Sequence, residues 1–381
     1  MGKRETKNRR RGLHLSAWVL VCAALAVVAV CVCGCGQTTG PSTKVSENWA
    51  AVEAGNSDYY LFTDSAGREV PLPRNIETVA PSGAYAKIYL TSLGADKLIS
   101  LPSNYSDKQK KYVGERIANL PTTGSFYGKN ADMNYEEIIR LSPDVIIDVG
   151  EAKEDIASDL DNLQEQTGLP VIFVEATLEN APQACRTLGE VLGTQDKAEP
   201  LAEYIDETFA FAEAHRAEIE AIGSPKVLYT AGPYGYEVKG SDKIHGAVLK
   251  MVGANNVADL TGMNSNEVSP EQVMAWAPDV VLLSASSSFY DGIKKDPTWA
   301  SVPAVMNDRV YEVPDDPYEW MDKPPSVQTV LGVKWLGNLL YPDIYDFDMV
   351  AETQKFYKLL WDYDMTEAEA RELLAHSTFA E

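Results

Sequence analysis

The chain has 381 residues, 45% of them hydrophobic and 23% charged, which is typical of a globular protein of about two domains and excludes a disordered chain or a collagen-like fibre. Its 33 basic and 56 acidic residues give a formal net charge of −23, which repels phosphate backbones and argues against nucleic acid as a partner. Four of the five cysteines precede residue 36, so Cys185 stands alone in the body and no internal disulfide is expected.

The N-terminus has the pattern of a secretory signal. Six basic side chains precede an apolar stretch at residues 15–32, and Gly34 and Cys35 follow it. This ending resembles the lipobox of bacterial lipoproteins, which implies cleavage before Cys35 and attachment of diacylglycerol to its thiol. The alternative is an uncleaved transmembrane anchor, because about 18 apolar residues can just span a bilayer. Both interpretations place the body outside the cytoplasm, anchored to the cell membrane.

We assign residues 1–35 to the signal peptide with its lipobox. Cleavage removes six basic groups and one acid, which lowers the net charge to −28. Residues 36–58 are rich in threonine, serine and glycine, and this composition predicts a flexible tether. The folded part is therefore expected to begin near Tyr59.

Beyond the tether, short β-branched apolar runs alternate with helical patterns. These runs lie at residues 77–80, 145–148, 171–174, 227–230, 280–283 and 310–313. Such runs are typical of strands buried on both faces, so the sequence predicts an α/β fold. Residues 62–70 differ, because two extended pieces flank the turn at residues 65–67. They predict an N-terminal hairpin packed on a sheet edge.

The body contains an internal repeat. Residues 134–147 match residues 269–282, and Glu136 and Glu271 precede a Pro-Asp pair at the same spacing in both copies. Each copy predicts a capped helix, a turn at Pro-Asp and a strand. Two helix ends with a C-cap glycine match in the same way, at residues 90–95 and 249–254. The sequence therefore predicts two similar Rossmann-like lobes.

A long helical pattern separates the two copies. Apolar residues recur at helical spacing between residues 195 and 222, with no proline after Pro200. A helix of about 22 residues measures about 33 Å, which is long enough to join an N-terminal lobe (59–194) to a C-terminal lobe (223–381). An ordinary surface helix within one lobe is the alternative. Two more helices are predicted in the tail, at residues 349–363 and 366–376, where they serve packing.

The ordered set of these features resembles the substrate-binding proteins of ABC importers, in the class that carries iron siderophores, haem, cobalamin and related metal complexes. The resemblance covers about residues 60–345. It rests on the lipobox, the two Glu and Pro-Asp elements and the long helix, together with residues 64–70, 93–95 and 299–311. Residues 324–342 look like those of a subgroup associated with iron complexes or with molybdate and tungstate.

The resemblance implies two rigid lobes joined by one helix, a ligand cleft between them and modest hinge closure. In this family an acidic residue on each lobe pairs with arginines of the permease, and the matching positions are Glu136 and Glu271. The helix macrodipole is the competing explanation, because an acid in the first turn contributes about 0.3–1 kcal/mol. The implied partners are a small ligand, the permease and its ATPase. We expect a monomer with no resident cofactor.

In doubly wound sheets, ligands bind beyond the carboxyl ends of the strands, so the loops that follow the predicted strands are the expected place for ligand contacts. Serine and tyrosine hydroxyls can hydrogen-bond a ligand, and aromatic rings supply rigid contact area for a bulky chelate. The alternative is that these side chains are solvated turn residues. The candidate ligand-binding residues from these loops are Ser82, Tyr85, Ser125, Tyr127, Tyr234, Tyr236, Tyr290, Tyr318 and Trp320.

Two further candidates bear on metals and anions. A bare zinc or manganese carrier needs several imidazole or carboxylate ligands, and only His245 of the four histidines is near a suitable loop. His245 is a candidate for an anion or haem iron, and Lys243 for neutralising an anionic ligand, although a lone histidine at a helix start is more often a surface residue and most lysines are solvated. We therefore predict no protein metal site.

No motif of an enzyme family is present. The segment at residues 124–130 has the wrong spacing for a phosphate-binding Walker loop, and Gly-x-Ser-x-Gly and His-Glu-x-x-His are absent. We predict no catalytic residues and an extracytoplasmic lipoprotein that captures a ferric siderophore or related iron chelate for an importer. The alternatives are a molybdate or tungstate carrier of the same fold and, from another class, a two-lobed α/β enzyme such as a transferase.

Overall fold

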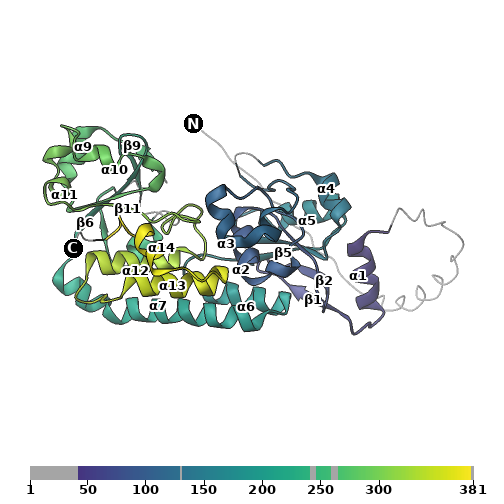
Figure 1. The fold of residues 1–381 in the computed structure, drawn as a ribbon. Helices are drawn as coiled ribbons and strands as arrows, with labels where there is room; N and C mark the ends of the chain where they lie inside the picture. The colour runs from purple at the N-terminus through teal and green to yellow at the C-terminus, as the bar shows by residue number, and fades with distance from the viewer. Residues whose placement is uncertain (1–41, 129–130, 241–245, 259–264, 379–381) are drawn as a thin grey trace, which may run out of the picture. The chain divides into compact units, whose positions relative to one another are not determined.

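The computed structural model describes residues 42–128, 131–240, 246–258 and 265–378 (Figure 1). Cys35, Lys243 and His245 lie outside the described residues. The chain is α/β, as predicted, with strands gathered into two larger sheets and a separate hairpin. No helix within the described ranges combines the length and apolar character needed to cross a membrane.

The N-terminal sheet has three parallel strands in the order β3 (Val79–Pro81), β4 (Val145–Gly150) and β5 (Val171–Glu175). Every residue of β4 is buried, which explains the continuous apolar run in the sequence. Its flanking helices are α2 (Ala84–Leu93), α3 (Asp107–Ala118), α4 (Tyr135–Leu141), α5 (Ile156–Thr167) and α6 (Ala181–Leu192), with a short 3-10 turn η1 (Ala95–Lys97) after α2.

The predicted hairpin is confirmed as β1 (Tyr59–Thr63) and β2 (Glu69–Pro73). The Asp64 carboxylate organises its turn, because it accepts hydrogen bonds from the backbone N–H groups of Ala66, Arg68 and Phe173. The N–H of Ser65 also donates to the carbonyl of Phe173 at 3.0 Å. Phe173 belongs to β5, so the hairpin is attached to the edge of the sheet.

The prediction of a flexible tether over residues 36–58 is wrong for part of that segment, which forms helix α1 (Lys44–Glu53). Thr43 and Ser46 form a capping box at its start. Lys44 Nζ donates to the carbonyl of Ser142 at 2.8 Å, and the buried amide of Asn48 donates to the carbonyl of Pro71 at 3.0 Å. These polar contacts come from distant parts of the chain, so local composition could not indicate them.

The C-terminal sheet has the order β11-β10-β6-β7-β9, with β8 also paired to β6. The strands β6 (Lys226–Ala231), β8 (Asn255–Asn256), β10 (Val280–Leu283) and β11 (Val310–Glu312) run parallel, whereas β7 (Glu237–Lys239) and β9 (Ser265–Glu267) are antiparallel additions that the sequence did not predict. Short helices surround it: α8 (Ala247–Met251), α9 (Pro270–Trp276), α10 (Tyr290–Ile293) and α11 (Pro303–Met306), with 3-10 turns η2 (Ala285–Ser287) and η3 (Trp299–Ser301).

The internal repeat is a structural repeat. Helices α4 and α9 both begin at a side-chain cap, from Asn134 and Ser269, and both end at a left-handed residue. The aspartate of each Pro-Asp pair then binds the backbone of a neighbouring strand. Asp144 pairs with Thr78 before β3, and Asp279 pairs with Lys226 in β6, each through its backbone N–H and its carboxylate. The spacing between the glutamate and the Pro-Asp pair is therefore the same in both copies because the aspartate fixes the end of each helix to the neighbouring strand.

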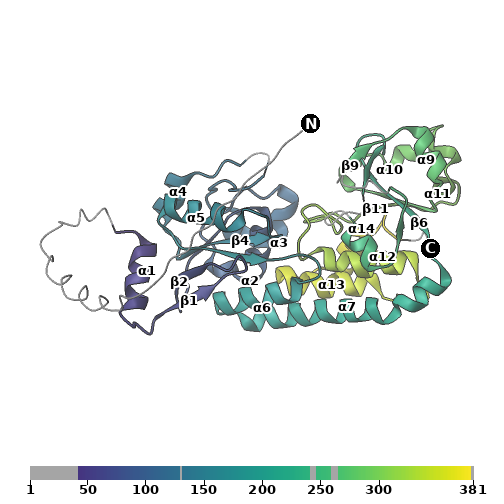
Figure 2. The ribbon, with the colours of Figure 1, turned by 180° about the vertical axis from the view of Figure 1, so that it is seen from behind.

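Helix α7 (Gln195–Ile222) occupies the segment for which the sequence predicts a long helix. It packs on α6 at one end and on α8, α12 (Thr329–Leu340) and α13 (Met349–Trp361) farther along, and Figure 2 shows it beside α12 and α13. Helix α13 also contacts α2 of the N-terminal sheet, so the chain end assigned to the C-terminal lobe also packs on the other sheet. The capping box predicted at Thr366 and Glu369 begins α14 (Glu367–Leu373).

One hydrophobic core joins the two sheets. Alternate residues of the central strands, such as Ile147 of β4 and Leu282 of β10, contribute to it together with Leu201 of α7 and Leu336 of α12. The opposite face of each sheet has a core of its own. Both sheets are thus buried on both faces, and the loops beyond their strands are left to form a site.

Candidate ligand-binding site

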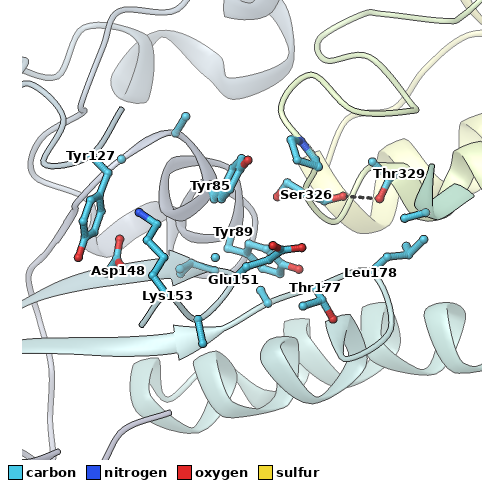
Figure 3. A pocket seen from close by; sticks show the side chains of 18 of the residues that line it. Tyr85, Tyr89, Tyr127, Asp148, Glu151, Lys153, Thr177, Leu178, Ser326 and Thr329 are labelled. Atoms are coloured by element: carbon cyan, nitrogen blue, oxygen red, sulfur yellow. Dashed lines mark hydrogen bonds between the residues drawn. The ribbon is translucent and has the colours of Figure 1, made fainter. Parts of the chain in front are cut away.

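A cavity of about 430 Å³ lies at the carboxyl ends of β4 and β5. Its N-terminal wall consists of the start of α2, the loop after β4 and the loop after β5. Its other wall consists of Ala247 of α8 and the segment that leads into α12, which contributes Met321, Pro325 and Ser326. Figure 3 shows side chains from both walls facing the same space. The cavity lies at the strand ends where the sequence predicted ligand contacts.

Tyr85 stands in the first turn of α2 and packs over the end of β4. A Cβ atom on Gly150 would lie 3.0 Å from Cδ2 of the Tyr85 ring, so glycine there lets the ring approach the backbone without being displaced. Burial raises the pKa of Tyr85, and the nearby carboxyl groups of Glu151 and Asp322 raise it further. The hydroxyl therefore stays protonated at neutral pH and can donate a hydrogen bond to a ligand.

The other end of the cavity has a cation above an aromatic ring. Lys153 Nζ lies 3.4 Å from the centroid of the Tyr127 ring, a cation–π contact that holds the lysine near Asp148 (Figure 3). Ser82 donates a short hydrogen bond to Asp148, whose side chain is buried. Burial raises the pKa of Asp148, although Ser82 and Lys153 oppose that rise. A lysine ammonium and a carboxyl group of weakened acidity thus lie together at this end of the cavity.

The cavity is acidic. Asp148, Glu151 and Glu179 line it, and Lys153 is the one cationic side chain among its described lining residues. An adjoining recess adds Glu175 and Lys250. Within the described part of the chain, no group of three or more histidine, cysteine or acidic side chains is arranged to hold a metal ion.

A buried polar network lies behind the second wall. The Tyr229 hydroxyl is 2.5 Å from Glu319 Oε1 and 2.8 Å from Asp322 Oδ1. One hydroxyl proton cannot serve two carboxylates, so one carboxyl group must carry a proton. Burial and the neighbouring Asp322 raise the pKa of Glu319 to about 7, so Glu319 takes up a proton more readily than an ordinary carboxyl group.

Two more side chains complete this network. Ser284 Oγ donates to Glu319 Oε2 at 2.5 Å, and Lys323 Nζ donates to Ser284 at 2.8 Å. The network therefore ties β6 and β10 to the segment that carries Met321. It positions the second wall without exposing its charges to the cavity.

Of the candidate residues predicted from the sequence, Tyr85 and Tyr127 line the cavity and Ser82 supports Asp148 from behind. Ser125 is held in its loop, since its N–H donates to Asp132 at 3.0 Å. Tyr318 lines a separate recess of about 250 Å³ beside α3. The remaining tyrosines lie elsewhere in the C-terminal sheet region: Tyr234 is 64% exposed, Tyr236 stacks on Trp299, and Tyr290 stacks on His376.

The prediction that the Trp320 ring faces a ligand is wrong. Trp320 is 1% exposed and meets Trp335 edge to face, with ring centroids 6.5 Å apart, so it belongs to the core. Sequence reasoning also missed Lys153, Glu179 and Met321, which line the cavity. Lys153 lies in the loop after the buried strand β4, and that position could have predicted its place in the cavity. No sequence pattern could have predicted the place of Met321.

Comparison with known proteins gives a consistent result. The profile of the periplasmic binding protein family matches residues 80–317. The molybdate-binding protein MolA of Haemophilus influenzae is 25% identical over 333 residues, which cover 80% of this chain and 92% of that protein.

Two solved structures are also similar. An ABC transporter solute-binding protein from Sulfurospirillum deleyianum superposes with a TM-score of 0.73 at 27% identity, covering 83% of this chain and 99% of that one. A periplasmic solute-binding protein from Veillonella parvula gives a TM-score of 0.69 at 27% identity, with coverage of 84% and 98%.

Proposed function

The chain belongs to the periplasmic binding protein family, and from that premise we propose that it captures a ferric siderophore or related iron chelate outside the cytoplasm and delivers it to the permease of an ABC importer. The family consists of substrate-binding components of transport systems rather than of enzymes, which removes the transferase alternative.

The acidic, tyrosine-rich cavity is the observation that carries the ligand assignment. A volume of about 430 Å³ exceeds what a single tetrahedral oxyanion fills, and it falls in the range of sites for drug-sized ligands. Tyr85, Tyr89 and Tyr127 line the cavity with aromatic surface, and the Tyr85 hydroxyl can donate a hydrogen bond. Both features favour a bulky chelate that brings its metal already coordinated.

The charge of the cavity narrows the class of chelate. Three lining carboxyl groups face one lysine, so a highly anionic ligand would meet repulsion at short range, where solvent screens charges least. A neutral or cationic ferric hydroxamate therefore fits better than a ferric catecholate, which carries several negative charges. Lys153 can still receive a single negative group of the ligand.

Molybdate is the second candidate. The similarity to MolA, which extends over most of both chains, favours it. The site would then have to hold a dianion among carboxyl groups, using Lys153, the Tyr85 hydroxyl and backbone N–H groups as donors. Tungstate would be expected to bind in the same way.

Isothermal titration of the purified protein tests these ligands against one another. The ligands are a ferric hydroxamate, a ferric catecholate, haem, molybdate and tungstate, and melting temperature is measured alongside. A ligand at 100 times its dissociation constant stabilises the folded state by about 2.7 kcal/mol. We expect the ferric hydroxamate to bind. Binding of molybdate or tungstate alone would replace the chelate proposal by the oxyanion one.

For delivery, we propose that Glu136 and Glu271 dock on basic groups of the permease. They occupy equivalent places in the first turns of α4 and α9, and both are exposed. The double variant Glu136→Gln/Glu271→Gln should lose transport into proteoliposomes while ligand affinity stays unchanged. Unchanged transport would remove the docking role.

We also propose that Cys35 carries the lipid anchor, on the strength of the lipobox in the sequence. Cells labelled with a radioactive fatty acid should incorporate label into the protein and not into Cys35→Ala. Label in the variant would contradict the assignment.

A further inference from the structure

Comparing the two copies of the repeat, α4 and α9, shows which of their shared residues stabilise the fold and which have no structural role. Ile138 and Val273 are buried at equivalent positions and anchor each helix to its sheet. The caps and the Pro-Asp turns are explained by the hydrogen bonds described above. The next residue along each helix is Ile139 in α4 and Met274 in α9. Packing in the core and the hydrogen bonds of the repeat do not explain why both are apolar.

Both side chains are exposed, Ile139 to 44% and Met274 to 42%. Only six large apolar side chains are exposed within the described residues, and two of them occupy this one repeated position. Single exposed apolar residues are normal on protein surfaces, but agreement between two copies of a repeat is not explained by chance exposure. Neither residue belongs to a hydrophobic cluster of the described core.

Each of these apolar side chains lies one helical turn beyond the docking glutamate. Ile139 follows Glu136 by three residues, as Met274 follows Glu271, and residues at this spacing are neighbours on a helix surface. Glu137 is neutralised by Arg140, with a contact of 2.6 Å, and the equivalent residue in the second copy is the uncharged Gln272. Each helix therefore presents one acid beside one apolar side chain.

We infer that Ile139 and Met274 are apolar contact points for the permease, so that each lobe docks through a patch of one carboxylate and one apolar side chain. This inference rests on the proposed docking function. The matching partner surface has a basic group next to an apolar depression, and it presents that combination twice. A permease with two equivalent subunits meets this requirement, because two like patches call for two like receptors.

Charge argues against other occupants of these patches. A second copy of this chain would bring acid against acid, and an anionic membrane surface would repel the same glutamates. A basic partner is complementary to both copies. The apolar side chains then add contact area that does not depend on salt.

The test measures binding of the ligand-free protein to the cognate permease–ATPase complex in nanodiscs. The variant Ile139→Asn/Met274→Gln removes the apolar surface, and its glutamine keeps an acceptor for the weak hydrogen bond that Ser301 donates to Met274. The matched control is Leu61→Gln/Met306→Gln, which changes two exposed apolar side chains outside the repeat. Melting temperature and ligand affinity are measured for every variant.

We expect the dissociation constant for the permease to rise at least about tenfold in the repeat variant and less than about twofold in the control. The loss should persist at about 0.5 M salt, where the effect of Glu136→Gln/Glu271→Gln should shrink. Full binding by the apolar variant, with weak binding by the glutamate variant, would overturn the inference and leave the docking proposal standing.

Full binding by both variants would remove the docking proposal as well. Two other outcomes would also overturn the inference. A loss of self-association in sedimentation, with unchanged permease binding, would assign the patches to a second copy. A loss of binding to empty phosphatidylglycerol vesicles would assign them to the membrane.

Discussion

The two walls of the cavity are built in different ways. The N-terminal wall presents its chemistry directly, with the Tyr85 and Tyr127 rings, the Lys153 ammonium and the Asp148 carboxyl group facing the space. The opposite wall presents Ala247, Met321 and Pro325 with the uncharged hydroxyl residues Ser326 and Thr329, while its charged groups lie behind it in the network around Tyr229.

The difference indicates a division of labour. On the proposed function, we expect the first wall to recognise the ligand and the second wall to supply shape, which a proton-sharing network keeps in place. Substitutions in the first wall should therefore change affinity, whereas substitutions in the network should change stability. The following predictions test that separation, from the largest expected effect to the smallest.

Removing the Tyr229 hydroxyl should have the largest effect on folding. Tyr229→Phe leaves Glu319 and Asp322 buried without the group that lies between them, which should lower the free energy of unfolding by about 3 kcal/mol. Urea denaturation measures this change. Tyr345→Phe is the matched control, because its equally buried hydroxyl has no hydrogen-bond partner within the described structure. Equal costs in both variants would show that the network does not hold the wall.

The network should also make stability depend on pH. The pKa of Glu319 is raised to about 7, so its contribution is complete below the unfolded-state value and is lost as pH rises through 7. Between pH 5 and 7.5 this loss should amount to about 2 kcal/mol. Glu319→Gln keeps a neutral side chain and should flatten that part of the stability curve. Parallel curves for the two proteins would mean that Glu319 is ionised throughout.

Substitutions in the first wall should lower ligand affinity rather than stability. Tyr127→Ala removes the ring under Lys153, and we expect a loss of about tenfold in affinity for the ferric chelate; because the ring also packs on the core of the N-terminal sheet, the free energy of unfolding is measured alongside. Met321→Ala, in the second wall, should cost less affinity. Tyr234→Ala, at an exposed position, serves as the control for aromatic truncation. A larger loss for Met321→Ala than for Tyr127→Ala would reverse the proposed roles of the walls.

The sequence predicted features that depend on local rules. The repeated caps and Pro-Asp turns, the hairpin and the capping box at Thr366 all use contacts between residues close in the chain or fixed by a strand. Helix α1 escaped prediction because its partners, such as Pro71 and Ser142, are remote and polar. The antiparallel β7 and β9 are too short for a periodic pattern.

The site was predictable only in part for the same reason. Position after a buried strand located Tyr85 and Tyr127, because strand ends meet at one edge of a sheet. The same rule could not separate a loop aromatic that faces the cavity from one that faces the core. Trp320 packs against Trp335, a partner in α12 that no local pattern connects to it.

The smallest effect should come from Gly150, where a single methyl group tests how closely Tyr85 must approach β4. In Gly150→Ala the new Cβ would lie 3.0 Å from the Tyr85 ring, so the ring must shift by a few tenths of an ångström. We expect a cost of about 1 kcal/mol in stability and about threefold in chelate affinity. Gly83→Ala is the control on the same wall, because no atom lies within 4 Å of its new Cβ.

A double-mutant cycle decides whether the ring is responsible for that effect. If the displaced Tyr85 ring causes part of the loss, Gly150→Ala should cost less in a Tyr85→Ala background, where only the backbone strain of a side chain at φ 158° remains. An unchanged cost in that background would place the strain in the backbone of the loop after β4. The position of Tyr85 would then be set by α2 alone, and the first wall would tolerate change at Gly150.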